Sequence, residues 1–82
     1  MSLLAKALLV VTMHQLNGNA TIGSESVSVL SNMDECRGAM TAFIRTKGNV
    51  QTVVNQTDSM SFEQVQPGWL PNTFYKLVCK EL

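Results

Sequence analysis

Two cysteines and one histidine are among the side chains of this sequence that could act as nucleophile, base or metal ligand. Cys36 lies near the start of a predicted helix, where the helix dipole can stabilise a thiolate, and His14 is the only histidine available as a base. However, Cys36 falls on the apolar stripe of that helix, which favours a core residue. One histidine and the distant pair Cys36 and Cys79 do not make a four-ligand metal site. We therefore predict no catalytic residue, no metal and no cofactor.

The two cysteines can be either reduced or joined. Cys36 and Cys79 fit no zinc, haem or redox spacing. They could form one disulfide in an oxidising compartment, or remain reduced as buried apolar side chains. Because no clear sign of export accompanies them, we expect the reduced form.

Charged side chains on the same helix have structural explanations. Asp34 and Glu35 point to different sides of the helix, in the first turn where the dipole favours negative charge. Arg37, Arg45 and Lys47 could form a small basic face for phosphate, but a solvated helix surface explains them more simply. We predict a structural function for all five.

Trp69 is the residue with the strongest indication of a binding function. It lies beside Leu70 in a loop between Pro67 and Pro71, and the prolines reduce the entropy that is lost when the loop becomes ordered. Tryptophan is also enriched among residues that carry interface energy. The alternative is a ring folded back as a lid on the core. The sequence does not decide between these two possibilities.

The composition limits the range of partners. With 82 residues, of which 45% are hydrophobic and 15% charged, the chain can form one domain over residues 1–82 with little charge to cover its surface. A surface hidden in a partner or an oligomer is therefore expected. Six Lys and Arg balance six Asp and Glu, which removes the electrostatic attraction that nucleic acid and anionic membranes exert. We accordingly expect neither of these as a partner.

The apolar run at residues 7–13 allows two interpretations. Lys6 precedes it, and Gly18 and Ala20 would suit a cleavage site, as in a signal peptide. The run is short for that purpose and contains Thr12, so we interpret it as a strand and leave secretion open. It is also too short to span a bilayer.

Apolar spacing and turn residues predict the order of the elements. Asn17 and Gly18 suit a tight hairpin turn between the first two strands. Asn32 and Glu35 have capping-box spacing at the start of the helix, and Gly48 is placed to terminate it. The predicted strands cover residues 5–16, 20–30, 50–57 and 73–80, with a helix at 33–47 and a short extended piece around 62–65.

This order predicts an α+β fold, with a mainly antiparallel sheet of about four strands and one helix packed on one face. Gly23 is expected to bend the second strand or form a bulge. In the first strand, Leu9 points to one side of the sheet, while Leu8, Val10 and Leu4 point to the other. One helix covers only one face, so either a partner or the loop of residues 58–72 must cover the second.

The organisation resembles that of small orphan accessory and virion proteins of tailed bacteriophages. The features that carry this resemblance are the Leu- and Val-rich strand at residues 7–11, the Ser- and Thr-rich return strand, the helix opening at residues 31–36, and Cys79 in the last strand. The resemblance implies an accessory or virion protein and carries over no functional residue.

We therefore expect a non-enzymatic protein-interaction module, such as a phage-encoded inhibitor or adaptor of a host protein. The alternative is a virion structural component, such as a capsid decoration or tail-associated subunit, and a third is a thiol enzyme using Cys36 and His14. The expected locations are the host cytoplasm or the virion, and a homo-oligomer is the simplest assembly. The predicted partner-binding residues are Trp69, Leu70, Leu8, Val10 and Leu4.

Overall fold

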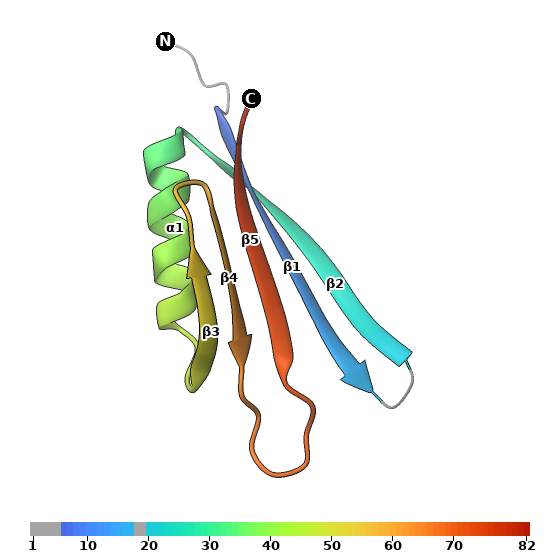
Figure 1. Cartoon of the computed structure of the whole chain (residues 1–82). Helices are drawn as coiled ribbons and strands as arrows, with labels where there is room; N and C mark the ends of the chain where they lie inside the picture. The colour runs from blue at the N-terminus through green and yellow to red at the C-terminus, as the bar shows by residue number, and fades with distance from the viewer. Residues whose placement is uncertain (1–5, 18–19) are drawn as a thin grey trace.

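The computed structural model describes residues 6–17 and 20–82 as an α+β fold in which one helix packs against an antiparallel sheet (Figure 1). The elements are β1 (Ala7–Asn17), β2 (Ala20–Leu30), α1 (Met33–Arg45), β3 (Val50–Asn55), β4 (Ser59–Gln64) and β5 (Thr73–Glu81). The predicted fold class is confirmed. The sheet has five strands instead of about four, because the predicted short extended piece is a complete strand that pairs with both β3 and β5.

The strands lie in the order β2-β1-β5-β4-β3, and all neighbours are antiparallel. The last strand of the chain is therefore the centre of the sheet, and β2 and β3 are its edges. The helix α1 connects these two edges and crosses one face of the sheet on the way (Figure 1).

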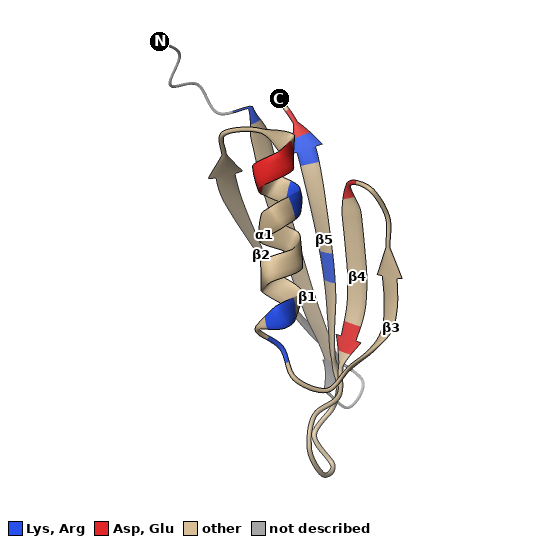
Figure 2. Ribbon diagram, turned by 90° about the vertical axis from the view of Figure 1, so that its left-hand side faces the viewer, with Lys and Arg blue, Asp and Glu red and all other residues tan. Residues whose placement is uncertain are grey.

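The helix begins where its capping residues predict. The Asn32 Oδ1 accepts a hydrogen bond from the Glu35 backbone N–H at 2.8 Å. The helix ends two residues earlier than expected, at Arg45, and the Thr46 hydroxyl donates to the Phe43 carbonyl at 2.6 Å. The left-handed residue after it is Asn49 (φ 56°) and not the predicted Gly48, since asparagine also tolerates this conformation. Acidic residues lie at its N-terminal end and a basic residue at its C-terminal end, as the dipole favours (Figure 2).

The core lies between α1 and one face of the sheet. The predicted helix stripe supplies Cys36 and Met40, which are buried, and Phe43, which packs against Phe62 and Tyr75. The buried apolar side chains are Ala7, Leu9, Cys36, Met40, Met60, Phe62, Leu77 and Cys79.

A disulfide joins the helix to the central strand within this core. Cys36 and Cys79 are bonded, with their Cα atoms 6.0 Å apart. The expectation of two reduced thiols is therefore wrong. The residues are 43 positions apart, and only the packing of α1 over β5 brings them together.

The two edges of the sheet differ in regularity. The pairing of β3 with β4 shifts between Gln51 and Val54, and Thr52 has a left-handed φ of 54°. By contrast, β2 pairs with β1 without any shift from Ala20 to Leu30. The bulge predicted at Gly23 is thus absent from this strand. A Cβ atom at Gly23 would lie 3.1 Å from the Met13 carbonyl oxygen, so the glycine instead permits a close approach of two backbones.

Candidate functional site

We use the term open face for the side of the sheet that faces away from α1. This face carries exposed apolar side chains. Side chains alternate between the two faces of a strand. Because Leu9, Leu77 and Cys79 belong to the core, their neighbours Leu8 and Val78 point to the open face. In the described part of the chain no helix or loop packs on this face.

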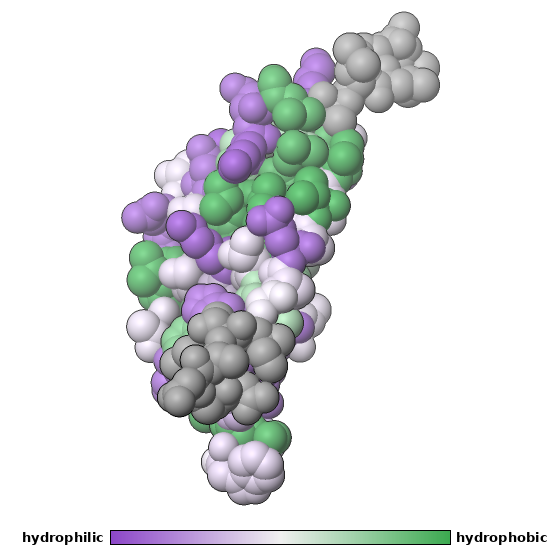
Figure 3. All heavy atoms as spheres, turned by 90° about the vertical axis from the view of Figure 1, so that its right-hand side faces the viewer, coloured by the Kyte–Doolittle hydropathy of each residue, from purple (hydrophilic) through white to green (hydrophobic). Residues whose placement is uncertain are grey.

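Five aliphatic side chains lie next to one another on the open face, and we call them the apolar cluster. Cross-strand pairing places Val27, Val10 and Val78 in one row across β2, β1 and β5, and Val29 beside Leu8 in the next row. Val27 is 53% exposed and Val29 is 65% exposed. Figure 3 shows hydrophobic side chains gathered over this part of the sheet, with hydrophilic ones beside and below them.

In β2 the polar side chains face the helix and the apolar ones face away from it. An edge strand packed on this core would be expected to show the opposite pattern. The serines of β2, Ser26 and Ser28, lie opposite Val11 and Leu9 on the helix side, and both serines are exposed. Its valines point the other way. The apolar side chains of this segment therefore add to the open face and not to the core that the chain builds for itself.

Below the apolar cluster, charged and aromatic residues continue the open face. Glu25, Thr12 and Lys76 form one cross-strand row, with the acidic residue on β2 and the basic residue on β5. The next row places His14 beside Phe74, and their rings stack with centroids 5.1 Å apart. The face thus carries the apolar cluster at one end, bordered by Lys80 on β5, with one charge of each sign flanking β1 in the row below.

The loop between β4 and β5 presents Trp69 away from the sheet. Figure 1 shows this loop extending past the ends of both strands, and Trp69 is 90% exposed. The alternative of a tryptophan lid on the core is therefore wrong. Gly68 has a left-handed φ of 67°, which glycine adopts without a steric penalty. Figure 2 shows no charged residue in this loop.

Hydrogen bonds order the base of the loop. The Asn72 side chain accepts from the Gln66 backbone N–H at 3.2 Å and donates to Glu63 at 2.7 Å. The hydroxyl of Thr73, which is 2% exposed, accepts from Gln15 at 2.6 Å and from Gln66 at 3.1 Å. The loop therefore holds its tryptophan on an ordered base.

The predicted binding residues do not form a single surface. Leu8 and Val10 lie on the open face, whereas Trp69 and Leu70 line a shallow depression with Gln15 at the other end of β1. Seven residues of strand separate Leu8 from Gln15, or roughly 23 Å. Trp69 and Leu70 thus lie apart from Leu8 and Val10. Leu4 lies outside the described residues.

Sequence reasoning did not include the valines of β2 and β5 in the binding surface. The alternation of valine with serine at Ser26, Val27, Ser28 and Val29 was the available signal. It marks a half-buried strand but leaves open which side is buried, because that depends on where the helix packs.

The candidate thiol site does not form. Cys36 is buried and bonded to Cys79, and His14 lies on the opposite face of the sheet. Two cations of the candidate basic face also bind groups within the chain. Arg37 binds the carboxylates of Asp58 at 2.9 Å and Asp34 at 3.0 Å, and these contacts, the Asp58 hydrogen bond first, raise the pKa of Arg37.

The Lys47 ammonium lies over the rings of Phe43 and Tyr75, 4.9 and 5.1 Å from their centroids. Like Arg37, it is therefore engaged within the chain. Arg37 and Lys47 thus make contacts that pack or dock the helix and the turn after it.

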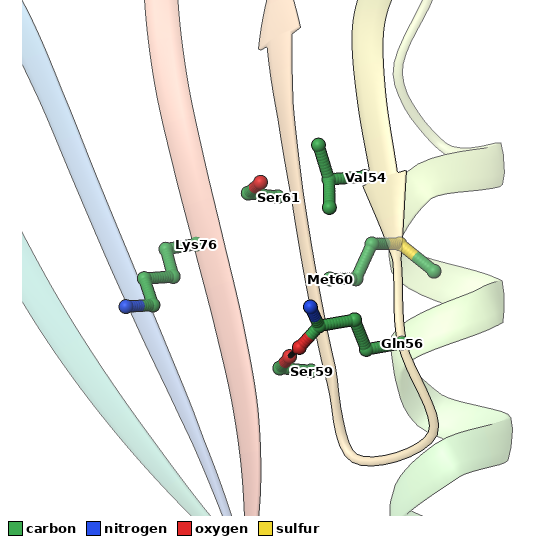
Figure 4. A pocket seen from close by; sticks show the side chains of 6 residues that line it. All are labelled: Val54, Gln56, Ser59, Met60, Ser61 and Lys76. Carbon is green, nitrogen blue, oxygen red and sulfur yellow. Dashed lines mark hydrogen bonds between the residues drawn. The ribbon is translucent and has the colours of Figure 1, made fainter.

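A second depression, of about 220 Å³, lies beside β3, β4 and β5 (Figure 4). Two serines and a lysine line it, which are residue types that can act together in acyl transfer. The Ser59 hydroxyl donates to the side-chain Oε1 of Gln56 at 3.0 Å, and the Lys76 ammonium points away from both Ser59 and Ser61. This arrangement does not activate a serine.

Two searches concern the described residues only. Among them, no group of three or more His, Cys, Asp or Glu side chains could hold a metal ion. The single helix of residues 6–17 and 20–82 is not long and apolar enough to cross a membrane. Comparison of the chain with protein-family models, with curated proteins and with solved structures found no match.

Proposed function

We propose that this chain is a non-enzymatic protein-interaction module that binds through the open face of its sheet. One observation carries the proposal: Val27 and Val29 point away from the helix while the serines of the same strand point toward it. A strand with this polarity is stabilised by something packed on the open face.

Burial of the apolar cluster contributes favourably to the free energy of binding. Complete coverage of a Val or Leu side chain contributes about 1.5 to 3 kcal/mol. Val27 and Val29 are mostly exposed, and Leu8, Val10 and Val78 are half-buried. The apolar cluster can therefore supply several kcal/mol, which offsets the entropy lost on association.

The Trp69 loop is a second contact surface of the module. Its base is ordered by hydrogen bonds, so little further ordering is needed when Trp69 enters a pocket of a partner. Aromatic side chains of this kind dominate the energy of many interfaces. Two surfaces at opposite ends of the sheet suit an inhibitor or adaptor that holds one protein through each.

The proposal is tested by affinity capture with matched baits. Val27→Asp places a carboxylate in the apolar cluster, and Trp69→Ala removes the exposed ring. The control, Ser26→Asp, adds the same carboxylate to the adjacent exposed position on the other side of β2. We expect specific partners, including further copies of the chain, to be captured by the wild type and the control and lost with one of the two test variants. Equal capture by all four baits would contradict the proposal.

A virion component is the second candidate, and the disulfide favours it. Disulfides persist in oxidising surroundings, which include virions and secreted proteins, and are rare in the cytosol. A subunit packed among symmetric neighbours would also cover the open face. Mass spectrometry of purified phage particles tests this candidate. Detection in stoichiometric amounts supports a structural subunit, and absence from the particles favours the inhibitor or adaptor.

A further inference from the structure

We infer that the open face is occupied by a second copy of this chain, in a two-fold dimer whose axis runs parallel to β1 between the two sheets. The inference rests on the proposed binding function of that face and names its occupant. Such an axis sets β1 against β1 of the partner and β2 against β5 of the partner. Each cross-strand row then faces the same row of the partner, with its β2 and β5 ends exchanged.

The charges on the open face match in this arrangement. Glu25 on β2 and Lys76 on β5 occupy the same row on either side of Thr12. Reversal of the row brings each Glu25 opposite the partner's Lys76, so that two ion pairs of opposite charge form. Both side chains are exposed in the single chain and have no ion-pair partner among the described residues.

Part of the apolar cluster is also self-complementary about this axis: Leu8 lies opposite its own copy, although Val29 in the same row lies opposite the partner's Lys80. In the row above the charges, Val27 comes to lie opposite the partner's Val78, and Val10 lies opposite its own copy. In the row below them, Phe74 lies opposite the partner's Gly23, so a large ring faces a residue without a side chain. Large residues facing small ones is the pattern by which packed sheets interdigitate.

An axis across the strands is disfavoured by the same residues. If it passed through the row of Val27, Val10 and Val78, it would reverse the direction of each strand and place Lys80 opposite the partner's Lys76. Glu25 would then face the partner's Val29, so that no Glu25–Lys76 pair would form. Like charges in a desolvated interface are costly. Continuation of the sheet by pairing of two β2 edges would leave the apolar cluster uncovered.

The dimer has a consequence for the second contact surface. Because an axis parallel to β1 preserves the strand direction, both Trp69 loops extend from the same end of the assembly. The dimer is therefore bivalent, which raises its affinity for a partner that offers two sites or is itself a dimer.

Sedimentation of the full chain at micromolar concentration tests the dimer. We expect the wild type and Ser26→Asp to sediment as dimers. Val27→Asp buries an unpaired carboxylate in each half, which should raise the dimer dissociation constant by about a hundredfold or more. Circular dichroism checks that the sedimenting monomer is folded.

A charge exchange tests the direction of the axis and does not depend on that variant. Glu25→Lys and Lys76→Glu should each weaken the dimer by about tenfold or more, and the double variant should restore most of the affinity. A monomeric wild type, a dimer that tolerates Val27→Asp, or a double variant no better than the singles would each overturn the inference. A monomeric wild type that captures another protein through Val27 would overturn the dimer and leave the binding module intact.

Discussion

The two faces of the sheet carry similar apolar residues, but only one face is covered by the helix. Leu77 and Val78 are neighbours in the central strand: Leu77 is completely buried under α1, whereas Val78 points to the open face and is half-buried. The same contrast separates Leu9 from Leu8 in β1. Apolar residues on both sides of a strand indicate two buried faces, and residues 6–17 and 20–82 form one helix for two faces. The second face is therefore the one through which we propose that the chain binds another molecule.

The two edges of the sheet repeat this contrast. At β3 the bulge and the left-handed Thr52 interrupt the row of backbone groups, which discourages pairing with another strand. At β2 the pairing register is regular, and the valines of that strand extend the apolar cluster to its margin. The β2 edge is thus less protected against pairing with another strand, although exposed valines lie at both edges.

Reduction of the disulfide should have the largest effect, because it releases the helix that covers one face. Closure of a loop of 43 residues stabilises a protein by roughly 4 kcal/mol on the chain-entropy estimate. We expect reduced protein to unfold at a lower urea concentration by about this free energy. The comparison of oxidised and reduced protein is made in the Val27→Asp variant, so that dimer formation does not contribute to the free energy of unfolding. Equal midpoints for oxidised and reduced protein would show that packing alone holds α1 on the sheet.

Neighbouring truncations in β5 compare the two faces directly. Leu77→Ala should lower the free energy of unfolding by about 3 kcal/mol, because it leaves a cavity in the core. Val78→Ala should cost about 1 kcal/mol or less in the monomeric Val27→Asp background. In the otherwise wild-type chain it should instead weaken the proposed dimer. A similar stability loss for both truncations in the monomer would mean that the open face is covered within one chain.

Thr52→Gly should stabilise the β3 edge by about 1 kcal/mol. A β-branched residue with a φ of 54° is strained, and glycine adopts this conformation without a steric penalty. The control is Val54→Gly in the same strand, which has no left-handed backbone to relieve and should be destabilising. Thermal unfolding measures both. A loss of stability in Thr52→Gly would show that the threonine side chain contributes more than its backbone strain costs.

The smallest expected effect is a loss of stability at acid pH. Hydrogen bonds from Asn72 first and from Gln51 second lower the pKa of Glu63, which lies on the open face beyond the apolar cluster. The stabilisation is therefore complete above the pKa of the unfolded state and is lost as the pH falls through the lower pKa of the folded state. We expect the unfolding midpoint of the wild type to fall more steeply at acid pH than that of Glu63→Gln. Parallel pH profiles would assign the acid sensitivity to other carboxylates.

Local sequence signals determined most of the secondary structure. Asn32 and Glu35 mark the start of the helix, and the apolar spacing from Cys36 to Phe43 marks its buried side. These patterns depend on residues within one or two turns of each other, so they can be recognised without the fold. The α+β class and the surplus of apolar residues in β1 follow from the same kind of reading.

Tertiary structure alone decided which partners these elements acquired. The sequence could not show that Cys36 meets Cys79, because only the crossing of α1 over β5 closes a gap of 43 residues. It could not show that Val27 and Val29 face away from the helix, because a strand with period two has two equivalent sides until its register and its neighbours are known. The sequence also could not show that Trp69 lies far from Leu8 and Val10, because the distance between them depends on the position of the loop at the other end of β1. The candidate site is thus a product of register and topology, which act between residues that are distant in the chain.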